Sequence, residues 1–387
     1  MWSNNKKIDA VINVLLFLLG LNFLYIGQYL LPIICLVIFI SNKCKFRVNN
    51  IKMFILLCIF SLTYWLFSIN LGLYGLISFC LPMCYYIGSN LKDKSKFKYA
   101  LYSITLGMAS HLIVNLVNEL IIYYFDLMNI FSKSNHIDFW LNKKVNSTLT
   151  ALNSVFLIGC LYYVMFYEHN KKIKYINVIV YILALFYSFA LGRRTTPILI
   201  LITLFVAFIL DIFLIKHDKL AHKTVILSTI LILFVILLTY IIFINNVFGI
   251  YDKLIQTRLF QKLITQGLSS GRLDILIQAI KIAPNHLWGG REILNELGSF
   301  VHDLWGDIYD YSGIIPYALM IVISIICVKN IINFLLNKEI DKKTKILVIP
   351  WFVCVCLIAF IEPLMSGGTI FLFSSAIVLS MVETISL

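Results

Sequence analysis

The chain has 387 residues, of which 60% are hydrophobic and only 13% are charged, and its formal net charge is +13. So small a polar fraction excludes a water-soluble globular protein, and an integral membrane protein is expected. The excess of Lys and Arg is explained by their placement in short loops, so no nucleic-acid partner is expected. The cysteines lie in predicted spans or, for Cys44, on the predicted cytoplasmic side, so no disulfide is expected.

Apolar runs of about 18 or more residues, enough for a helix to cross a bilayer, recur along the whole chain. They predict an all-α polytopic membrane protein of about twelve transmembrane helices, forming one integral membrane domain over residues 1–387. The predicted spans are residues 9–25, 27–41, 53–69, 72–89, 99–124, 148–167, 175–191, 197–215, 224–244, 313–336, 346–361 and 369–385.

Basic clusters lie in every second loop between these spans. Short loops rich in Lys and Arg stay in the cytoplasm, so both termini are predicted to be cytoplasmic. This orientation requires a tight turn near Gly27 or Gln28, which separates the first two spans. The clusters lie at residues 6–7, 43–52, 92–98, 171–174, 216–223 and 338–345.

Arg193 and Arg194 lie in a short turn between the spans 175–191 and 197–215, on the predicted outer side. Adjacent arginines at this place oppose the positive-inside rule, so a specific role is expected for them. One interpretation is a clamp for a phosphate, because the guanidinium fork matches phosphate oxygens and a helix N-terminus favours the same charge. The alternative is that one or both arginines extend to the lipid phosphates of the outer leaflet.

The longest charged segment, residues 246–312, lies between the ninth and tenth predicted helices on the outer side and is expected to carry the active site. Its acidic and basic side chains are balanced, which argues against a general polybasic surface. Apolar residues recur at helical spacing over 271–282 and predict a helix on the membrane surface, with Ser269 and Ser270 as caps. Pro284 then ends the helix.

Trp288, in a Trp-Gly-Gly turn, is a candidate for stacking on a sugar, and anchoring at the membrane interface is the alternative. His302 is the candidate general base, because imidazole titrates near neutral pH, and Asp303 is its candidate partner. The alternative for His302 is a loop histidine without a function, and this interpretation is kept for His286.

The predicted fifth span carries His111, Asn115, Asn118 and Glu119 on one face of its outer half. Polar residues at such a depth usually face a cavity or another helix. Two interpretations remain open, the lining of a substrate cavity and hydrogen bonding between helices. Glu362, in the last outer turn, is a further candidate for lining the same site.

His302 and Asp303 precede nine residues and then Gly313. An Arg-containing segment, 270–272, and a Pro/Gly segment, 284–290, come before them. In this order and on the outer side, these segments resemble the motifs of the O-antigen ligase and O-antigen polymerase superfamily. Its signature is a histidine and a polar residue followed by nine variable residues and a glycine. Asp303 stands where that superfamily usually has an amide or a serine.

The turn 192–195 is similar to a Ser-Arg-Thr turn of the same superfamily. The resemblance implies a metal-independent glycosyltransferase of the GT-C type that needs no cofactor. It also implies that the enzyme acts on glycans linked to undecaprenyl diphosphate, at the outer face of the bacterial inner membrane. In this interpretation His302 activates the acceptor hydroxyl with Asp303 as its partner. The candidate substrate-binding residues are Arg193, Arg194, Arg272, Arg291, Glu119 and Trp288.

A polymerase of surface polysaccharide, which uses lipid-linked glycans as donor and acceptor, is the expected function. An O-antigen ligase, which transfers glycan to lipid A core, is the first alternative. A flippase of about the same number of spans is the second, although no internal repeat is seen, and a non-enzymatic receptor is the third. Membrane lipids, a chain-length regulator and a separate flippase are the further expected partners.

Overall fold

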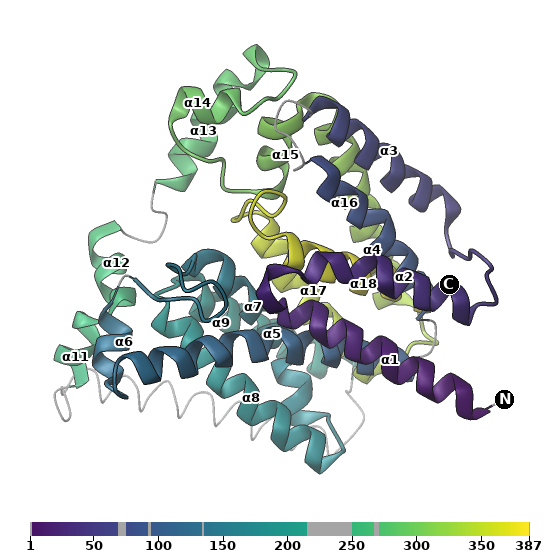
Figure 1. Ribbon diagram of the computed structural model, residues 1–387, viewed down its shortest axis with the longest axis horizontal. Coiled ribbons are helices and arrows are strands. Elements are labelled where there is room, and N and C mark those ends of the chain that lie inside the picture. The colour runs from purple at the N-terminus through teal and green to yellow at the C-terminus, as the bar shows by residue number, and fades with distance from the viewer. Residues whose placement is uncertain are drawn as a thin grey trace. The chain divides into compact units, whose positions relative to one another are not determined.

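The computed structural model describes residues 2–68, 75–91, 94–133, 135–214, 250–266 and 271–386 (Figure 1). Within these ranges the chain is helical and forms no β-strand, so the predicted all-α class is confirmed there. The α-helices are α1 (Trp2–Leu21), α2 (Leu30–Ser41), α3 (Ile51–Phe67), α4 (Cys80–Ser89), α5 (Lys94–Ile122), α6 (Leu127–Ser132), α7 (Ser147–Phe166), α8 (Lys171–Ala190), α9 (Thr195–Leu214), α11 (Ile250–Gln256), α12 (Arg258–Gln266), α13 (Arg272–Ile282), α14 (Glu292–Leu297), α15 (Leu304–Ser312), α16 (Ile314–Leu336), α17 (Lys342–Ala359) and α18 (Thr369–Ser386). The 3₁₀ turns are η1 (Phe23–Tyr25), η2 (Gly27–Tyr29) and η5 (Ala283–Asn285).

A helix lies on each predicted span except 224–244, which is outside the described residues. Among the described residues, five helices are long and apolar enough to cross a membrane. These five are Lys96–Ile122 within α5, α8, α9, α16 and α18. The predicted turn near Gly27 is formed by η1 and η2, and the Asn22 side chain accepts a hydrogen bond from the Gly27 N–H at 3.0 Å. The full set of spans stays a prediction.

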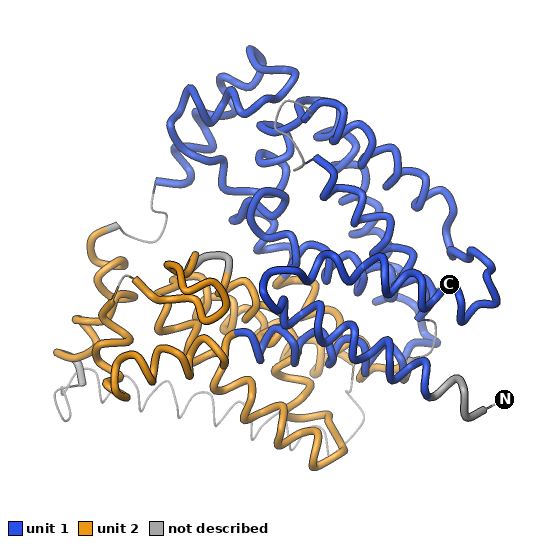
Figure 2. Tube along the Cα trace, in the orientation of Figure 1, with its two compact units in different colours: residues 1–111, 269–340, 355–387 blue, residues 112–268, 341–354 orange. Residues whose placement is uncertain are grey.

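The chain divides into two compact units (Figure 2). Unit 1 comprises residues 1–111, 269–340 and 355–387. Unit 2 comprises residues 112–268 and 341–354. The predicted outer segment therefore contributes α11 and α12 to unit 2, and α13, α14 and α15 to unit 1.

Unit 1 is built around the close packing of α4 against α18, with α3 and α16 beside them. Gly88 of α4 lies against α18, where an added Cβ would meet the Ile377 carbonyl oxygen and come within 2.6 Å of the Ser380 Cβ. A residue without a side chain is therefore required for this backbone approach. The Ser380 hydroxyl donates a hydrogen bond to the Tyr85 carbonyl at 2.8 Å, which links the two helices again.

A buried carboxylate ties three helices of unit 1 together. Glu383 of α18 accepts hydrogen bonds from the Tyr85 hydroxyl of α4 at 2.8 Å and from the Asn50 amide at 3.0 Å. Asn50 also caps α3, since its side-chain oxygen accepts the Met53 N–H at 3.2 Å. One polar cluster thus fixes the start of α3 against α4 and α18.

Unit 2 packs α7 against α8 and α9. Asp211 of α9 is buried and accepts hydrogen bonds from the Tyr162 hydroxyl at 2.7 Å and from the Tyr167 hydroxyl. Tyr162 also packs with Ala207 and Ile346 in an apolar cluster. A charged residue within an apolar helix is tolerated here because both hydroxyls satisfy it.

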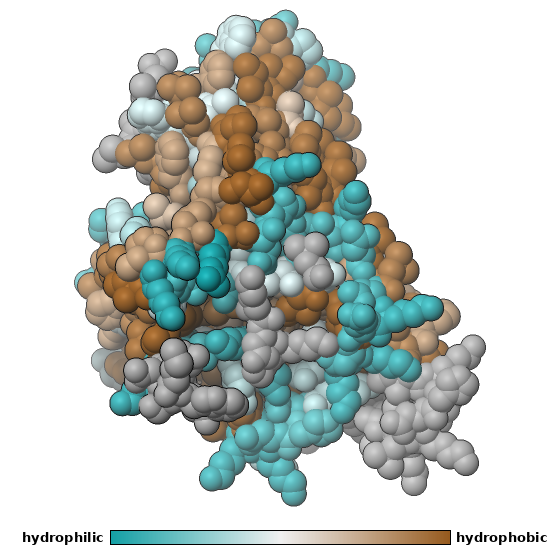
Figure 3. All heavy atoms as spheres, turned by 90° about the vertical axis from the view of Figure 1, so that its right-hand side faces the viewer, coloured by the Kyte–Doolittle hydropathy of each residue, from teal (hydrophilic) through white to brown (hydrophobic). Residues whose placement is uncertain are grey.

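Helix α3 turns a row of apolar side chains outward. Figure 3 shows a face on which hydrophobic side chains gather in the upper part and hydrophilic ones form a band below. Such an apolar surface suits contact with lipid rather than water. The outward residues of α3 are Ile51, Ile55, Ile59, Leu62 and Leu66, each 45–54% exposed.

The helix predicted over 271–282 is confirmed as α13. The proposed caps Ser269 and Ser270 lie outside the described residues, and the residue that precedes the helix is Gly271, with φ of 72°. Ala279 of α13 is buried in a small apolar core with residues of α14 and α15, including Ile293 and Tyr309. This core holds α13, α14 and α15 as one packed group.

Substitution of Gly88 by leucine is expected to lower the stability of the protein by about 2–3 kcal/mol, because the new side chain must displace α18. The loss should appear as a lower melting temperature of the purified protein in detergent. Met83→Leu on the same helix is the control and should melt as the wild type does. Equal melting of all three proteins would contradict the close approach of α4 and α18.

Candidate functional site

The candidate site of unit 1 lies where α15 begins. Asp303 is the N-cap of α15, and its Oδ1 accepts the Gly306 N–H at 2.7 Å. Its second oxygen, Oδ2, is buried without a hydrogen-bond partner, and burial raises the pKa of the Asp303 carboxyl. The hydrogen bond that Asp303 accepts from Gly306 holds the helix, so its role as the orienting partner of His302 stays a prediction.

His302 precedes this cap and is half-buried. Its Nδ1 atom is buried without a hydrogen-bond partner. Burial lowers the pKa of His302, and the positive charge of Arg272 lowers it further, whereas Glu362 acts in the opposite direction. The imidazole is therefore neutral at physiological pH, which is the form that a general base requires.

Arg272 and Glu362 form an ion pair beside this histidine, with an N–O distance of 3.2 Å. The same Arg272 nitrogen donates to the Ile361 carbonyl at 2.9 Å. The Glu362 side chain is only 2% exposed, while that of Arg272 is 29% exposed. Arg272 can thus meet a ligand while a buried carboxylate holds its position.

Two further carboxylates fix α15 against its neighbours. Asp307 is buried, and its Oδ2 accepts the N–H groups of Met365 and Ser366, both at 2.9 Å. Asp310 accepts the Leu294 N–H at 3.1 Å and so holds the start of α14. Burial raises the pKa of Asp307 to about 7 and raises that of Asp310. The charge pattern of the sequence indicated neither role.

The predicted Trp-Gly-Gly turn is held against the end of α15. Gly289 and Gly290 have φ of 77° and 82°, and the Gly290 N–H donates to the Tyr311 carbonyl at 3.1 Å. A Cβ on Gly289 would lie 2.6 Å from the Gly313 nitrogen, so glycine is required there. Trp288 is 64% exposed and stacks on Phe67, with ring centroids 5.8 Å apart. Its predicted contact with a sugar is untested.

Arg291 follows this turn with φ of 63°. Its N–H donates to the Asp310 carbonyl at 2.7 Å, and its guanidinium lies 4.3 Å from the Tyr311 ring centroid and 5.2 Å from that of Phe300. These cation–π contacts hold the guanidinium against two aromatic rings. The predicted role of Arg291 in substrate binding stays a prediction.

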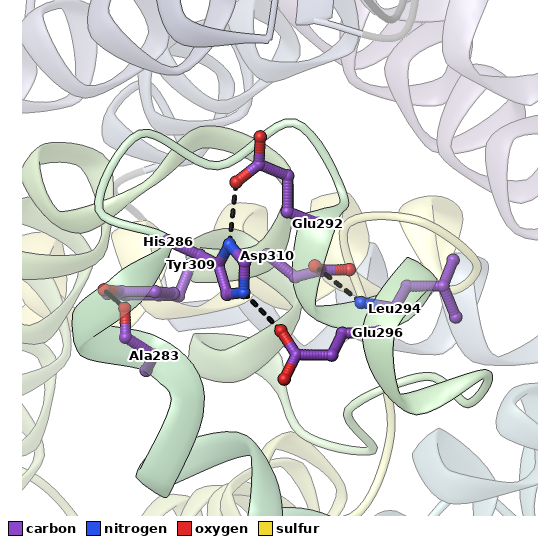
Figure 4. A network of polar contacts seen from close by, with 7 residues as sticks. All are labelled: Ala283, His286, Glu292, Leu294, Glu296, Tyr309 and Asp310. Carbon is purple, nitrogen blue, oxygen red and sulfur yellow. Dashed lines mark hydrogen bonds and ion pairs between the residues drawn. The ribbon is translucent and has the colours of Figure 1, made fainter.

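His286, which the sequence analysis left without a function, joins η5 to α14 (Figure 4). Its Nδ1 lies 2.7 Å from a Glu292 carboxylate oxygen and its Nε2 lies 2.6 Å from one of Glu296. Hydrogen bonds with Glu296 and Glu292 raise the pKa of His286. The two glutamates are four residues apart on a short helix, a spacing visible in the sequence, but the histidine that joins them depends on the fold.

The predicted arginine turn lies in unit 2. Gly192 has φ of 67° and the Arg258 side chain packs on it, with Cγ 2.9 Å from the position of an added Cβ. Arg193 donates to the Thr195 hydroxyl at 2.7 Å, and Arg194 donates to the Lys262 carbonyl at 3.3 Å. The turn is therefore tied to α12 by main-chain and side-chain contacts.

Two cations that the sequence analysis did not assign join this turn. Lys262 of α12 donates to the Gly192 carbonyl at 3.4 Å. Arg258 has a buried Nη1 without a hydrogen-bond partner. Together with Arg193 and Arg194 they make a cluster of four cations, the cationic turn, which suits a multivalent anion such as a diphosphate. Residues 258 and 262 are too far from the turn in sequence for a local pattern to have joined them.

Glu119 is fully buried in unit 2 and has structural partners. Its Oε1 accepts the Ile137 N–H at 2.6 Å, and its Oε2 lies 3.4 Å from the Nδ1 of the buried His136. Asn115 similarly accepts the Phe139 N–H at 3.0 Å. The polar face of α5 thus holds the segment 135–146. Neither interpretation of this face from the sequence, the lining of a substrate cavity or hydrogen bonding between helices, had included this segment. Its predicted substrate contact is untested.

The predicted site residues therefore form two sets. In unit 1, His302 lies near Arg272 and Glu362, while Asp303, Arg291 and Trp288 belong to the segment that contains α13, α14 and α15. In unit 2, Arg193 and Arg194 share the cationic turn and Glu119 lies in α5. Over the described part of the chain, no three His, Cys, Asp or Glu side chains are arranged as a metal site.

Replacement of Asp307 by asparagine tests the buried carboxylate. The folded state holds a proton up to about pH 7, whereas the unfolded chain releases it near 3.8, so this group lowers stability as pH rises through that window. In the wild type, the free energy of unfolding should fall by about 1 kcal/mol per pH unit in this range because of Asp307. This contribution should be absent in the Asn variant. Melting temperatures across the window give the measurement. The exposed Asp274→Asn variant is the control, and equal slopes for all three proteins would contradict the burial of a protonated carboxyl.

No protein-family model matches the sequence, and no curated protein matches it. The resemblance to the O-antigen ligase and polymerase superfamily therefore depends on the motifs quoted from the sequence alone.

Proposed function

We propose that the protein is a polymerase of surface polysaccharide in the bacterial inner membrane. In this proposal it has twelve transmembrane spans and both termini in the cytoplasm. It joins oligosaccharide units linked to undecaprenyl diphosphate at the outer face of the membrane. The five long apolar helices and the predicted charge placement support the membrane assignment.

The neutral, half-buried His302 beside the Arg272–Glu362 pair is the observation that carries the proposal. A histidine whose pKa is lowered by burial and by a neighbouring cation accepts a proton at neutral pH. Arg272 supplies positive charge at the same place, and its position is fixed by a buried carboxylate. A base and a cation side by side suit a transfer reaction in which a hydroxyl loses a proton and an anion departs.

The proposed reaction uses these groups as follows. The acceptor sugar hydroxyl transfers its proton to a ring nitrogen of His302, and its oxygen forms a bond to the anomeric carbon of the donor. The bond from that carbon to the lipid diphosphate breaks, and the diphosphate leaves with the electron pair. Arginine guanidinium groups stabilise the negative charge on the leaving diphosphate.

The cationic turn of unit 2 supports recognition of a diphosphate. Arg193, Arg194, Arg258 and Lys262 gather there, and Arg258 retains a buried N–H group without a partner. Four cations suit the charge of a diphosphate better than that of a neutral sugar. In this proposal Arg258 and Lys262 join the predicted substrate-binding residues.

Chain elongation by the purified protein is the direct test of the proposed function. The protein with its undecaprenyl-diphosphate-linked repeat unit, without added metal, should produce a ladder of longer lipid-linked glycans on a gel. His302→Ala and Arg194→Ala should each reduce the ladder about a hundredfold or more, the size expected for loss of a general base or a charge-stabilising group.

His169→Ala and Lys253→Ala, in which an exposed histidine and an exposed lysine are removed, are the matched controls and should keep the ladder. Transfer to added lipid A core without a ladder would instead identify a ligase. No transfer to either acceptor by folded protein would refute the transferase and favour a flippase.

The pH dependence of elongation tests the charges around His302. Activity requires the neutral imidazole, so the acidic limb of the profile should lie below the ordinary histidine pKa of 6.5. Arg272→Gln should shift this limb to higher pH, because the cation that lowers the pKa is removed. Glu362→Gln should shift it to lower pH for the opposite reason. Relative rates between pH 4 and 9 give the measurement, and limbs that do not move in opposite directions would exclude His302 as the titrating group.

A further inference from the structure

A pocket of about 530 Å³ lies within unit 1, between α3, α16 and α18. Lys52 lines it from α3, Lys329, Asn330 and Asn333 line it from α16, and Glu383 lines it from α18. The pocket is on the predicted cytoplasmic side, whereas the candidate site is predicted on the outer side. Its volume is within the range of about 300–1,000 Å³ that is typical of small-ligand sites. Neither the proposed function nor the resemblance assigned a ligand to any of these residues.

Hydrogen bonds between the three helices fix the walls of this pocket. The Asn50 amide, at the start of α3, donates to one Glu383 oxygen at 3.0 Å, and the Tyr85 hydroxyl donates to the other at 2.8 Å. The Asn337 amide, directly after α16, donates to the Ser386 carbonyl of α18 at 3.4 Å. The start of α3 and the ends of α16 and α18 are therefore held together, as expected if all three lie at one membrane surface.

Lys329 has no explanation in the composition of a membrane helix. The sequence of α16 holds no other charged residue, and Lys329 lies about 10 Å from the end of this helix at 1.5 Å per residue. A charge at such a depth is costly unless it reaches the membrane surface or meets a partner. Lys329 is exposed, and its ammonium group has no hydrogen-bond or ion-pair partner within the described part of the chain. It is therefore available to an anion.

The remaining polar groups of the pocket suit a phosphate that carries hydroxyl groups. Among the described residues, the side chains of Lys52, Asn330 and Asn333 also have no hydrogen-bond partner. Amides donate and accept, so they can bind hydroxyl groups. Glu383 is only 6% exposed, and both its oxygens already accept hydrogen bonds. Two lysines against one glutamate leave the lining with a net positive charge.

The pocket is polar near the helix ends and apolar toward the membrane interior. Leu56 lines it one helical turn deeper along α3 than Lys52, and Ile326 lines it one turn deeper along α16 than Asn330. This order matches a phospholipid of the cytoplasmic leaflet, whose head group lies at the surface and whose acyl chains extend into the hydrocarbon core.

We propose that the pocket binds the head group of an anionic phospholipid of the cytoplasmic leaflet, of the chemistry of phosphatidylglycerol. The single negative charge of its phosphodiester suits Lys52 and Lys329, and its glycerol hydroxyls suit the Asn330 and Asn333 amides. The ammonium group of phosphatidylethanolamine needs a free acceptor, and the Glu383 oxygens are occupied. A lipid bound there contacts α3 and α16 together and stabilises the folded protein. This inference does not depend on the proposed function.

Native mass spectrometry of the full-length protein tests the pocket. Protein freed of its own lipid in detergent is titrated with phosphatidylglycerol, phosphatidylethanolamine and phosphatidylcholine that carry the same acyl chains. Phosphatidylglycerol should bind about tenfold more tightly than either zwitterionic lipid. The double variant Lys52→Gln/Lys329→Gln should bind it about tenfold more weakly than the wild type does, because both cations of the pocket are removed.

Lys45→Gln/Lys338→Gln is the matched control. It removes the same charge at two exposed lysines of the predicted cytoplasmic side that do not line the pocket, so phosphatidylglycerol should bind it as tightly as the wild type. Equal weakening in both double variants would overturn the proposal, since a general attraction to the basic surface would then account for binding. Equal affinity of the wild type for all three lipids would also overturn it.

The melting temperature distinguishes a lipid from a free anion. Phosphatidylglycerol should raise the melting temperature of the wild type and of the control, but not that of the pocket variant. Inorganic phosphate should not reproduce this rise. A rise of the same size with inorganic phosphate, absent in the pocket variant, would refute the lipid site and identify a site for a small anion. If the lysine variant does not fold, Asn333→Asp, which places a negative charge in the pocket at an exposed position, takes its place.

Discussion

The candidate site depends on three carboxylates, one at the N-cap of α15 and two within this helix, that accept main-chain N–H groups. Asp303, Asp307 and Asp310 are spaced four and three residues apart, so they share one face of the helix. Asp303 caps the helix, Asp307 holds the 365–366 turn, and Asp310 holds the start of α14. One helix of nine residues thereby fixes the turn at 365–366, the start of α14 and the segment that carries His302 relative to one another.

This frame explains how a charged site persists in an apolar protein. The ion pair of Arg272 with Glu362 balances charge beside His302, and burial keeps the imidazole neutral. The Arg291 guanidinium lies against two aromatic rings and interacts electrostatically with the nearby Asp310 carboxyl. Glu362 thus fixes a guanidinium, whereas the carboxylates of Asp303, Asp307 and Asp310 accept main-chain N–H groups.

Local patterns in the sequence were sufficient for the helices and insufficient for the contacts between them. Hydrophobic runs predicted α16 and α18 because length and composition determine such helices, and the periodicity of 271–282 predicted α13. Asp303 was interpreted as a partner of His302, although its place before a helix is typical of an N-cap. The contacts of Arg258 with Gly192, and of Glu119 with residues 136 and 137, join segments distant in sequence. No local pattern carries that information, so these pairs emerge only from the folded chain.

Because the α15 carboxylates bind main-chain N–H groups, they place no restriction on the amino acids at the positions that they hold. The turn at 365–366 and the start of α14 are held through their N–H groups, so the identity of their side chains is left unconstrained by these bonds. Substitutions on those segments can therefore alter the surface offered to a ligand without moving the helix that carries the candidate base. A protein built in this way can acquire new ligand preferences by exchanging surface residues, while the architecture around His302 stays the same.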